Sequence, residues 1–202
     1  MLCQPVLDMQ ANSIFELSLF NVLFTIGFSE VQEPKRGPAR LDCSGEKKSM
    51  VRVLFVCLGN ICRSPMAEAV FAHKVKVAGL EKEIEADSAG TGNWHIGQPP
   101  HRGTRALLKE RQIAYVHAAR LLTPYDLDVF DYVLTMDDQN LADVLALGTN
   151  RAVVKPFLEY APHLPLLEVP DPYFTGDFEE TYGLVDAAAD GLLAAIRAEH
   201  EI

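Results

Sequence analysis

From residue 50 onward, short apolar runs alternate with longer amphipathic segments. The run 51–57 is apolar over almost its whole length, as expected of a strand covered on both faces. Within 64–79 the apolar residues recur at helical spacing, at Met66, Ala67, Val70, Phe71 and Val75. The pattern predicts strands at 51–57, 84–88, 132–136 and 152–158. It predicts helices at 64–79, 104–111, 137–147 and about 178–199.

Strands and helices that alternate along a chain are typical of an α/β fold with a parallel sheet and helices on both faces. We therefore expect three layers. In such folds, ligands bind beyond the carboxyl ends of the strands, where strand-to-helix loops meet the N-termini of helices. The loop at 58–63 follows the first strand, and it is the leading candidate for a binding site.

The first 49 residues have a different pattern. Residues 14–28 form an apolar run that is short for a membrane span and lacks the basic start of a signal peptide. The residues after it are rich in proline, glycine and charge, which is typical of a linker. We expect 1–49 to be an N-terminal extension and 50–202 to be the folded domain. The extension is either sequence upstream of a native start at Met50, or a poorly ordered tail or weakly membrane-associating helix.

Composition narrows the classes of function. Of the 202 residues, 49% are hydrophobic and 23% are charged, which is ordinary for a soluble globular protein. The net charge of −10 argues against a nucleic-acid partner, although a few local donors can still bind a phosphate. The four cysteines are too few for a disulfide-rich secreted scaffold, which favours a reducing, cytoplasmic setting. We expect no stable membrane insertion.

The residues of the loop after the first strand suit an anion. Gly59 and Asn60 tolerate the positive φ angles that a tight loop needs, and Pro65 suits the first turn of the next helix. Backbone N–H groups and the helix dipole would converge on one anion, and Arg63 would add a planar fork for two phosphate oxygens. The same field favours the thiolate form of Cys57, which makes it a candidate nucleophile.

Two observations limit this interpretation of the loop. The lysine of nucleotide-binding loops is absent, so a kinase or ATPase loses its main support. A cysteine at the end of a buried strand is often only a small hydrophobic residue, and the bare Cys-x5-Arg-Ser pattern is moderately specific. Its position between a strand and a helix, with Gly-Asn inside it, favours phosphate chemistry over a purely structural loop.

Together with three later motifs, the loop resembles that of the low-molecular-weight protein tyrosine phosphatases. CLGNICRSPMAE at 57–68 is similar to that family's loop nearly letter for letter. The motifs DSAGT at 87–91, NWHIGQPPHRG at 93–103 and Asp171-Pro172-Tyr173 recur at the expected places. The resemblance covers about 50–202. It implies a four-stranded parallel sheet and the hydrolysis of phosphotyrosine, in proteins or small aryl phosphates, with no metal and no cofactor.

The resemblance also implies roles for individual residues. Cys57 would attack phosphorus and form a phosphocysteine intermediate, while Arg63 would bind the phosphoryl oxygens. Asp171 would protonate the leaving phenolate and then activate the hydrolytic water. Trp94 and Tyr173 would form aromatic walls around the substrate ring.

The remaining implied site residues hold the loop or bind phosphate through it. The loop itself supplies Leu58, Gly59, Asn60, Ile61, Cys62 and Ser64, with Asn60 fixing its shape. Ser64 and Ser88 would complete the hydrogen bonds around the loop, and Ser64 would also ease the departure of the thiolate. A polar cluster beneath the loop would contain Glu68, Asp87, His117 and Asp137.

Several of these residues have simpler explanations. Asp-Pro pairs such as Asp171-Pro172 are common in turns. His117 is more often a hydrogen-bonded structural residue than a catalyst, and the histidines show no metal-ligand spacing. Cys62 either forms a reversible disulfide with Cys57 or is a buried small side chain.

Three other functions fit the sequence less well than a phosphatase does. A thiol-dependent arsenate reductase needs a further cysteine beyond the loop, and none follows Cys62. A non-catalytic phosphate-binding module would be expected to lack the nucleophile or the acid, yet both Cys57 and Asp171 are present. A redox switch made of Cys57 and Cys62 gives no reason for Arg63. The sequence therefore favours a phosphatase.

Overall fold

The structure is a computed structural model, and it describes residues 40–41, 47–48, 50–148 and 151–202. Within 1–49 it describes a short antiparallel pair, β1 (Arg40–Leu41) with β2 (Lys47–Lys48). The predictions for the apolar run at 14–28 lie outside the described residues. None of the helices in the described ranges combines the length and apolarity that crossing a membrane requires.

The central sheet has four parallel strands in the order β4-β3-β5-β6, as expected. These strands are β3 (Val51–Cys57), β4 (Ile84–Gly90), β5 (Tyr132–Thr135) and β6 (Val153–Pro156). Strand β3 pairs with β4 along its whole length, and Val53 to Val56 also pair with β5. Because β3 has a neighbour on each side, the loop that follows it leaves from the middle of the sheet.

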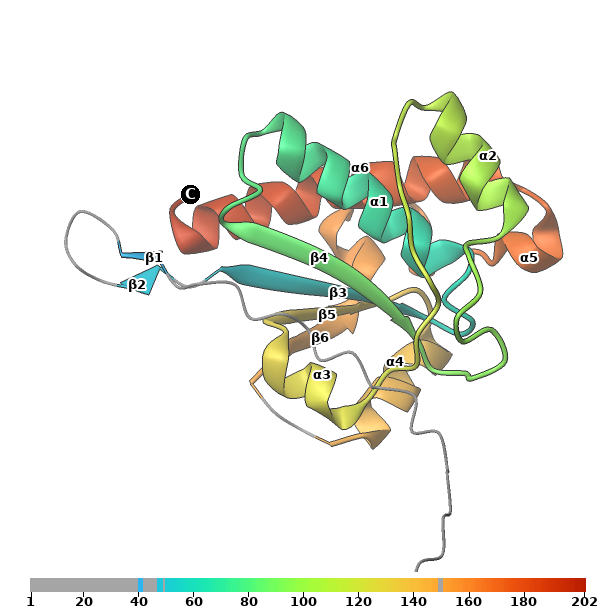
Figure 1. Cartoon of the computed structure of the whole chain (residues 1–202), viewed down its shortest axis with the longest axis horizontal. Helices are drawn as coiled ribbons and strands as arrows, with labels where there is room; N and C mark the ends of the chain where they lie inside the picture. The colour runs from blue at the N-terminus through green and yellow to red at the C-terminus, as the bar shows by residue number, and fades with distance from the viewer. Residues whose placement is uncertain (1–39, 42–46, 49, 149–150) are drawn as a thin grey trace, which may run out of the picture. The chain divides into compact units, whose positions relative to one another are not determined.

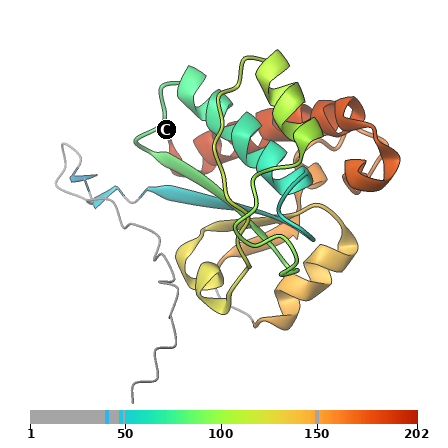
Figure 2. The same cartoon turned by 45° about the vertical axis from the view of Figure 1, so that its right-hand side comes forward.

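Helices cover both faces of the sheet, which confirms the predicted layers (Figure 1). One face carries α1 (Arg63–Val77), α2 (Arg102–Glu110) and α6 (Phe178–His200). The other carries α3 (Pro124–Val129) and α4 (Asp138–Ala146), as the turned view in Figure 2 also shows. Between α6 and β6 lie the 3-10 helix η1 (Phe157–Tyr160) and the short α5 (Pro172–Thr175).

Strand β3 feeds both hydrophobic cores. Its residues 51, 53, 55 and 57 pack into the core under α1 and α6, and Leu54 and Val56 pack into the core on the α3 and α4 side. This alternation is the period-2 rule of a strand, here with apolar residues on both faces. It also directs Cys57, the last residue of the strand, toward the α1 side.

The predicted elements are all present, and their ends differ by a few residues. The predicted strand at 152–158 is shorter, because β6 ends at Pro156 and the chain turns into η1. Proline lacks the N–H that a strand needs to continue its ladder. Helices α3 and α5, of six and four residues, were not predicted. Both begin with proline in the first turn after a polar residue, Thr123 or Asp171.

Candidate active site

Residues 57–63 curl between the end of β3 and the start of α1. Asn60 has a φ of 52°, in the left-handed region that short polar side chains tolerate. Its backbone N–H donates to Cys57 Sγ at 3.3 Å. The expectation that Gly59 also takes a positive φ is wrong, since its φ lies outside that region. Gly59 instead makes room, because a Cβ there would lie 3.1 Å from the His95 ring.

The Asn60 side chain fixes the direction of the hydrogen bonds around the nucleophile. Its Oδ1 accepts from the backbone N–H of Arg120 at 2.9 Å, so the amide nitrogen must face the other way. That nitrogen, Nδ2, donates to Ser64 Oγ at 3.0 Å and to Ser88 Oγ at 2.9 Å. Ser64 therefore accepts from Asn60, and its own proton faces Cys57 Sγ at 3.0 Å and, at the longer distance of 3.4 Å, the carbonyl of Ala89.

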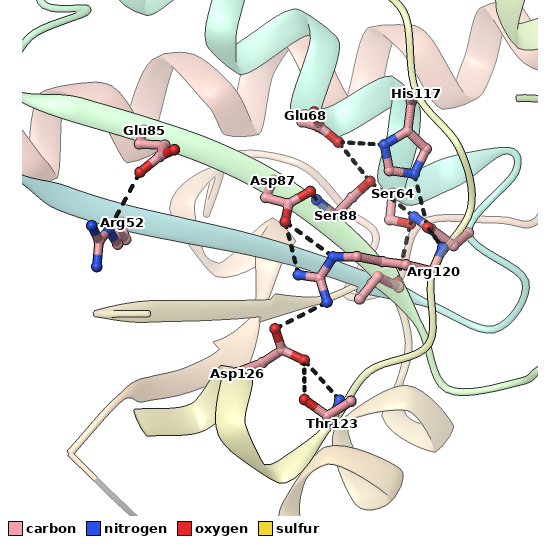
Figure 3. Close-up of polar contacts among 12 residues, drawn as sticks. Arg52, Ser64, Glu68, Glu85, Asp87, Ser88, His117, Arg120, Thr123 and Asp126 are labelled. Atoms are coloured by element: carbon pink, nitrogen blue, oxygen red, sulfur yellow. Dashed lines mark hydrogen bonds and ion pairs between the residues drawn. The ribbon is translucent and has the colours of Figure 1, made fainter. Parts of the chain in front are cut away.

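This chain of hydrogen bonds ends at the carboxyl group of Glu68. Ser88 Oγ donates to Glu68 Oε2 at 2.7 Å, and the hydroxyl of Tyr115 donates to the same oxygen at 2.6 Å. His117 lies beside them, with Nδ1 3.4 Å from Glu68 Oε2 and Nε2 2.8 Å from Asn60 Oδ1 (Figure 3). We call Asn60, Ser64, Ser88, Glu68, Tyr115 and His117 the floor network.

Burial perturbs the acid–base groups of the floor network. Desolvation raises the pKa of Glu68 to about 7, and the nearby Asp87 adds to the rise. Desolvation also lowers the pKa of His117, with Arg120 acting in the same direction. A neutral His117 can donate to Asn60 from Nε2 and accept at Nδ1, where a protonated Glu68 could donate.

Arg120 ties the floor network to the opposite side of the sheet. Its guanidinium donates to Asp87 Oδ2 at 2.8 and 3.0 Å and pairs with Asp126 Oδ1 at 2.9 Å. Figure 3 shows the side chain extending between these two carboxylates. Asp126 in turn accepts from the backbone and hydroxyl of Thr123, which caps α3. The backbone of residue 120 thus has a fixed position from which to hold Asn60.

Arg63 begins α1, and its side chain is almost completely buried. NH1 donates to Asp137 Oδ2 at 2.6 Å and to the carbonyl of Val169 at 3.3 Å, while NH2 donates to Asp171 Oδ2 at 2.9 Å. Desolvation opposes its charge, but Cys57, Asp171 and Asp137 outweigh it and raise the pKa of the guanidinium. Arg63 Nε has no partner among the described residues. Asp137 therefore lies against Arg63, not beside Glu68, Asp87 and His117.

Asp171 reaches the loop from a distant part of the chain. It caps α5, where its Oδ1 accepts from the backbone N–H of Tyr173 at 3.0 Å. Its other oxygen, Oδ2, accepts from Arg63, so both oxygens are held. The cap fixes the carboxyl group at the edge of the loop, although 108 residues separate it from Arg63.

A pocket of about 140 Å³ opens above the loop. Cys57, Arg63 and Asp171 all line it, together with the loop residues Leu58, Gly59, Ile61 and Cys62. Its mouth is aromatic: Trp94, Tyr173 and Phe174 are 66%, 57% and 79% exposed. The predicted walls, Trp94 and Tyr173, thus lie at the pocket, and Phe174 and His95 join them.

The second cysteine of the loop is buried beside the pocket. Both Cys57 and Cys62 are free thiols in this structure. Desolvation, together with the neighbouring Asp171 and Cys57, raises the pKa of Cys62 to about 12. Cys62 packs with Ile61 and Ala119 in a small apolar cluster. It is thus a neutral thiol at physiological pH, in contrast to what a nucleophile requires.

One group of side chains has the composition of a metal site. Ligand atoms of Glu68, Asp87 and His117 lie within 4.8 Å of one another. Glu68 Oε2 already accepts from Tyr115 and Ser88, and Asp87 Oδ2 accepts from Arg120. These carboxylate oxygens serve as acceptors within the floor, so the group is accounted for without an ion.

Two functional neighbours were absent from the sequence-based site, Tyr115 and Arg120. The tyrosine lies in an irregular stretch between α2 and α3, where no periodicity distinguishes a buried side chain. Arg120 acts largely through its backbone N–H, which every residue except proline carries. Neither residue gives a local signal from which its contact could be predicted.

Comparisons with known proteins agree with this geometry. The family model described as low molecular weight phosphotyrosine protein phosphatase matches residues 52–202. The chain is 46% identical over 156 residues to the low molecular weight protein-tyrosine-phosphatase YfkJ of Bacillus subtilis, covering 76% of this chain and 100% of the relative. It is 39% identical over 145 residues to PtpA of Staphylococcus epidermidis, covering 71% of this chain and 92% of the relative.

Solved structures show the same similarity. The crystal structure of YfkJ from Bacillus subtilis superposes with a TM-score of 0.73 at 47% identity, over 75% of this chain and 97% of that one. A protein tyrosine phosphatase from Entamoeba histolytica superposes with a TM-score of 0.69 at 31% identity. That match covers 75% of this chain and 98% of the Entamoeba chain.

Proposed function

This chain belongs to the low molecular weight protein-tyrosine phosphatase family and is a phosphotyrosine hydrolase, and we propose that Cys57, Arg63 and Asp171 carry out its reaction. One observation carries the assignment. A thiol and a guanidinium from one loop, and a carboxyl group from 108 residues further along the chain, line one pocket of about 140 Å³. Each supplies a different requirement of phosphoryl transfer, namely a nucleophile, charge stabilisation and an acid.

In the first step, Cys57 Sγ attacks phosphorus. The S–P bond forms as the bond from phosphorus to the phenolic oxygen breaks, and Asp171 gives its proton to the departing phenolate. The N–H of Asn60 and the hydroxyl of Ser64 stabilise the thiolate beforehand, at 3.3 and 3.0 Å from Sγ. In the second step, Asp171 takes a proton from water as the water attacks phosphorus. The S–P bond then breaks and the thiolate returns.

Arg63 is arranged to bind the phosphoryl oxygens once Asp171 carries its proton. Asp137 and the carbonyl of Val169 hold NH1, while Nε has no partner among the described residues. NH2 is paired with Asp171, and protonation of that carboxyl group weakens the pair. NH2 and Nε then form the two-pronged donor that suits a phosphoryl group. The acid and the arginine are therefore set for the substrate by the same proton.

The proposed function also includes the bounds of the catalytic domain, the substrates and the cellular compartment. We take 50–202 as the catalytic domain and 1–49 as an extension of it. Phosphoproteins are the substrates that the family implies, and within them we assign phosphotyrosine, with small aryl phosphates as substitutes. A thiol nucleophile needs a reducing environment, so we assign the enzyme to the cytoplasm.

The decisive assay compares leaving groups. The purified protein should hydrolyse p-nitrophenyl phosphate and a phosphotyrosine peptide without added metal, and Cys57→Ser should lose this activity. Asp171→Asn should lose about 10²- to 10⁴-fold with the phosphotyrosine peptide. It should lose much less with p-nitrophenyl phosphate, because nitrophenolate leaves without a proton.

Two matched variants control for folding and charge. Cys43→Ser removes a cysteine from the 1–49 segment, and Asp128→Asn removes an exposed carboxylate on α3. Both should keep wild-type rates. Activity in Cys57→Ser would rule out the thiol as nucleophile. An equal loss with both leaving groups in Asp171→Asn would rule out the carboxyl group as the acid.

A further inference from the structure

A second hollow lies beside the catalytic pocket. It has a volume of about 510 Å³ and lies between α2 and the turn that joins α5 to α6. Ala106 and Leu107 of α2 and the ring of Phe178 supply its apolar part. Glu110, Asp177 and Glu179 supply carboxylates. We call this hollow the acidic groove.

The acidic groove and the catalytic pocket are lined by residues that follow one another in the chain. Phe174 lines the pocket and the next residue, Thr175, lines the groove. His101 contacts one ring of each: it stacks on Phe178 at 5.2 Å with an interplanar angle of 1°, and it meets Tyr173 edge-on at 6.0 Å. An extended peptide advances about 3.3–3.6 Å per residue, so residues within about three positions of the phosphotyrosine can reach the groove.

A glycine allows Phe178 to pack against α2 at this groove. At Gly103, in the first turn of α2, a Cβ would lie 2.5 Å from the ring of Phe178. The absence of a side chain there lets the ring lie against the helix and form an apolar surface. Gly176 closes α5 with a φ of 76°, which turns the chain away toward Asp177.

The charges that face the groove are predominantly negative. Among the described residues, Glu110 makes no ion pair, and Asp177 uses Oδ1 to cap α6 through the N–H of Glu180. Arg111 pairs with Glu179 at 2.6 Å and leaves the other two carboxylates unbalanced. The groove residues of α2 recur at helical spacing, at 103, 106, 107 and 110, whereas its basic residues are at 102, 105 and 109.

An apolar surface with carboxylates around it suits a lysine or an arginine. The aliphatic stem of such a side chain lies along apolar atoms while its charged end reaches the carboxylates. His101, which stacks on Phe178, adds no positive charge of its own, because desolvation and the nearby Arg102 and Arg105 lower its pKa. These two arginines are not among the residues that line the groove. A glutamate or aspartate at the same place would meet like charges.

We propose that the acidic groove binds a lysine or arginine side chain of the substrate polypeptide, within about three residues of the phosphotyrosine. The enzyme thus selects phosphotyrosines that have a basic residue nearby. This selection rests on the proposed function, since it concerns the polypeptide that carries the reacting group. It is a property of Glu110 and Asp177, and neither residue lines the catalytic pocket.

A scan of phosphotyrosine peptides tests the proposal. Lysine, alanine or glutamate is placed at each position from three residues before to three residues after the phosphotyrosine, in an otherwise alanine peptide. At the best position we expect kcat/KM for lysine to exceed that for alanine by about 3- to 10-fold, with glutamate below alanine. Higher salt should reduce the preference, because the contacts are exposed.

Variants of the groove residues then test whether the preference for a nearby lysine arises in the acidic groove. Glu110→Gln with Asp177→Asn should abolish it, and asparagine still caps α6. Glu81→Gln with Asp128→Asn removes the same charge from exposed positions elsewhere and should retain it. Equal kcat/KM for the three peptides at every position, or an unchanged preference in the groove variant, would overturn the proposal. p-Nitrophenyl phosphate has no flanking residues, so loss of its hydrolysis would instead count against the proposed function.

Discussion

The floor and the mouth of the catalytic pocket are made of different kinds of side chain. The floor network is polar and hydrogen-bonded. Asn60, Ser64 and Ser88 are each no more than 1% exposed, and Glu68, Tyr115 and His117 are partly buried. The mouth is aromatic and open, with Trp94, Tyr173 and Phe174 all more than half exposed. Asn60, Ser64, Ser88 and Glu68 each make more than one hydrogen bond, whereas the exposed rings of Tyr173 and Phe174 contact each other edge-on.

This difference separates two tasks. Buried polar groups that are fully hydrogen-bonded specify one geometry, and losing a partner leaves another group unsatisfied at substantial cost. Exposed aromatic rings gain their energy when a substrate covers them, so their loss is felt in binding. We therefore expect floor variants to change stability and kcat together, and mouth variants to change KM alone.

Among the floor and mouth variants, Asn60→Ala should have the largest effect on stability and kcat. It removes hydrogen bonds to Ser64, Ser88 and the backbone of Arg120, and each buried group left unpaired costs about 1–3 kcal/mol. It also removes the group that orients Ser64 toward the nucleophile. We expect kcat/KM to fall by about 10²- to 10³-fold and the urea midpoint to fall with it.

Asn60→Gly serves as the matched variant. Glycine adopts the φ of 52° without strain, so it should recover about 1 kcal/mol of the stability lost in Asn60→Ala. It should not recover activity, because the amide is still absent. Equal activity of Asn60→Gly and wild type would show that the backbone conformation alone matters.

Comparing Glu68→Gln with the wild type should show how the raised pKa of Glu68 makes the stability of the protein depend on pH. Burial raises the pKa of Glu68 from its ordinary value of 4.5 to about 7 in the folded protein, so folding favours the protonated form. The stability it contributes is complete below pH 4.5 and is lost as pH rises through 7. Relative to Glu68→Gln, the wild type should therefore lose about 3 kcal/mol between pH 4.5 and 8, measured by urea denaturation. Parallel curves for the two proteins would contradict a raised pKa.

The same contrast explains what could be predicted from the sequence. Strand β3 and the loop were predictable because their signals are local: an apolar run, Gly-Asn, and a cysteine five residues from Arg-Ser. Asp171 needed the family resemblance, because its contact with Arg63 spans 108 residues and no local pattern encodes it. The same holds for Tyr115, whose partner Glu68 lies 47 residues away on α1.

The two helices that the sequence did not predict, α3 and α5, are both very short. Helix α3 carries a capping box from Thr123 to Asp126 with Pro124 in its first turn, so a signal existed but the helix has only six residues. Helix α5 has four residues and depends on the Asp171 cap. Elements this short have too few positions for an apolar period, and their tertiary contacts decide them.

A smaller effect on the floor is expected from Tyr115→Phe. It removes one hydrogen bond to Glu68, at a cost of about 1–2 kcal/mol in stability and about 3- to 10-fold in kcat. Because that hydrogen bond lowers the pKa of Glu68, its loss should also move the pH-dependent loss of stability to higher pH. Tyr132→Phe is the control, since its hydroxyl donates to Glu199 at 2.6 Å. It should lose similar stability with kcat unchanged.

The smallest change in the folded protein should come from Trp94→Ala. The indole is 66% exposed, so stability should stay within about 0.5 kcal/mol of wild type. KM for aryl phosphates should rise about 3- to 10-fold through lost stacking, with kcat nearly unchanged. Leu167→Ala, at a residue that is 83% exposed, controls for the loss of exposed apolar surface.

Gly92 allows the same position to be tested without deleting the indole. A Cβ at residue 92 would lie 1.7 Å from the ring of Trp94, so Gly92→Ala must displace the ring while keeping it in the chain. If the mouth acts by placing an aromatic face beside the substrate, Gly92→Ala should raise KM as Trp94→Ala does. If any nearby apolar surface suffices, Gly92→Ala should keep the wild-type KM. A fall in kcat with either variant would mean that the mouth also sets the geometry of the loop, which would end the separation of the two regions.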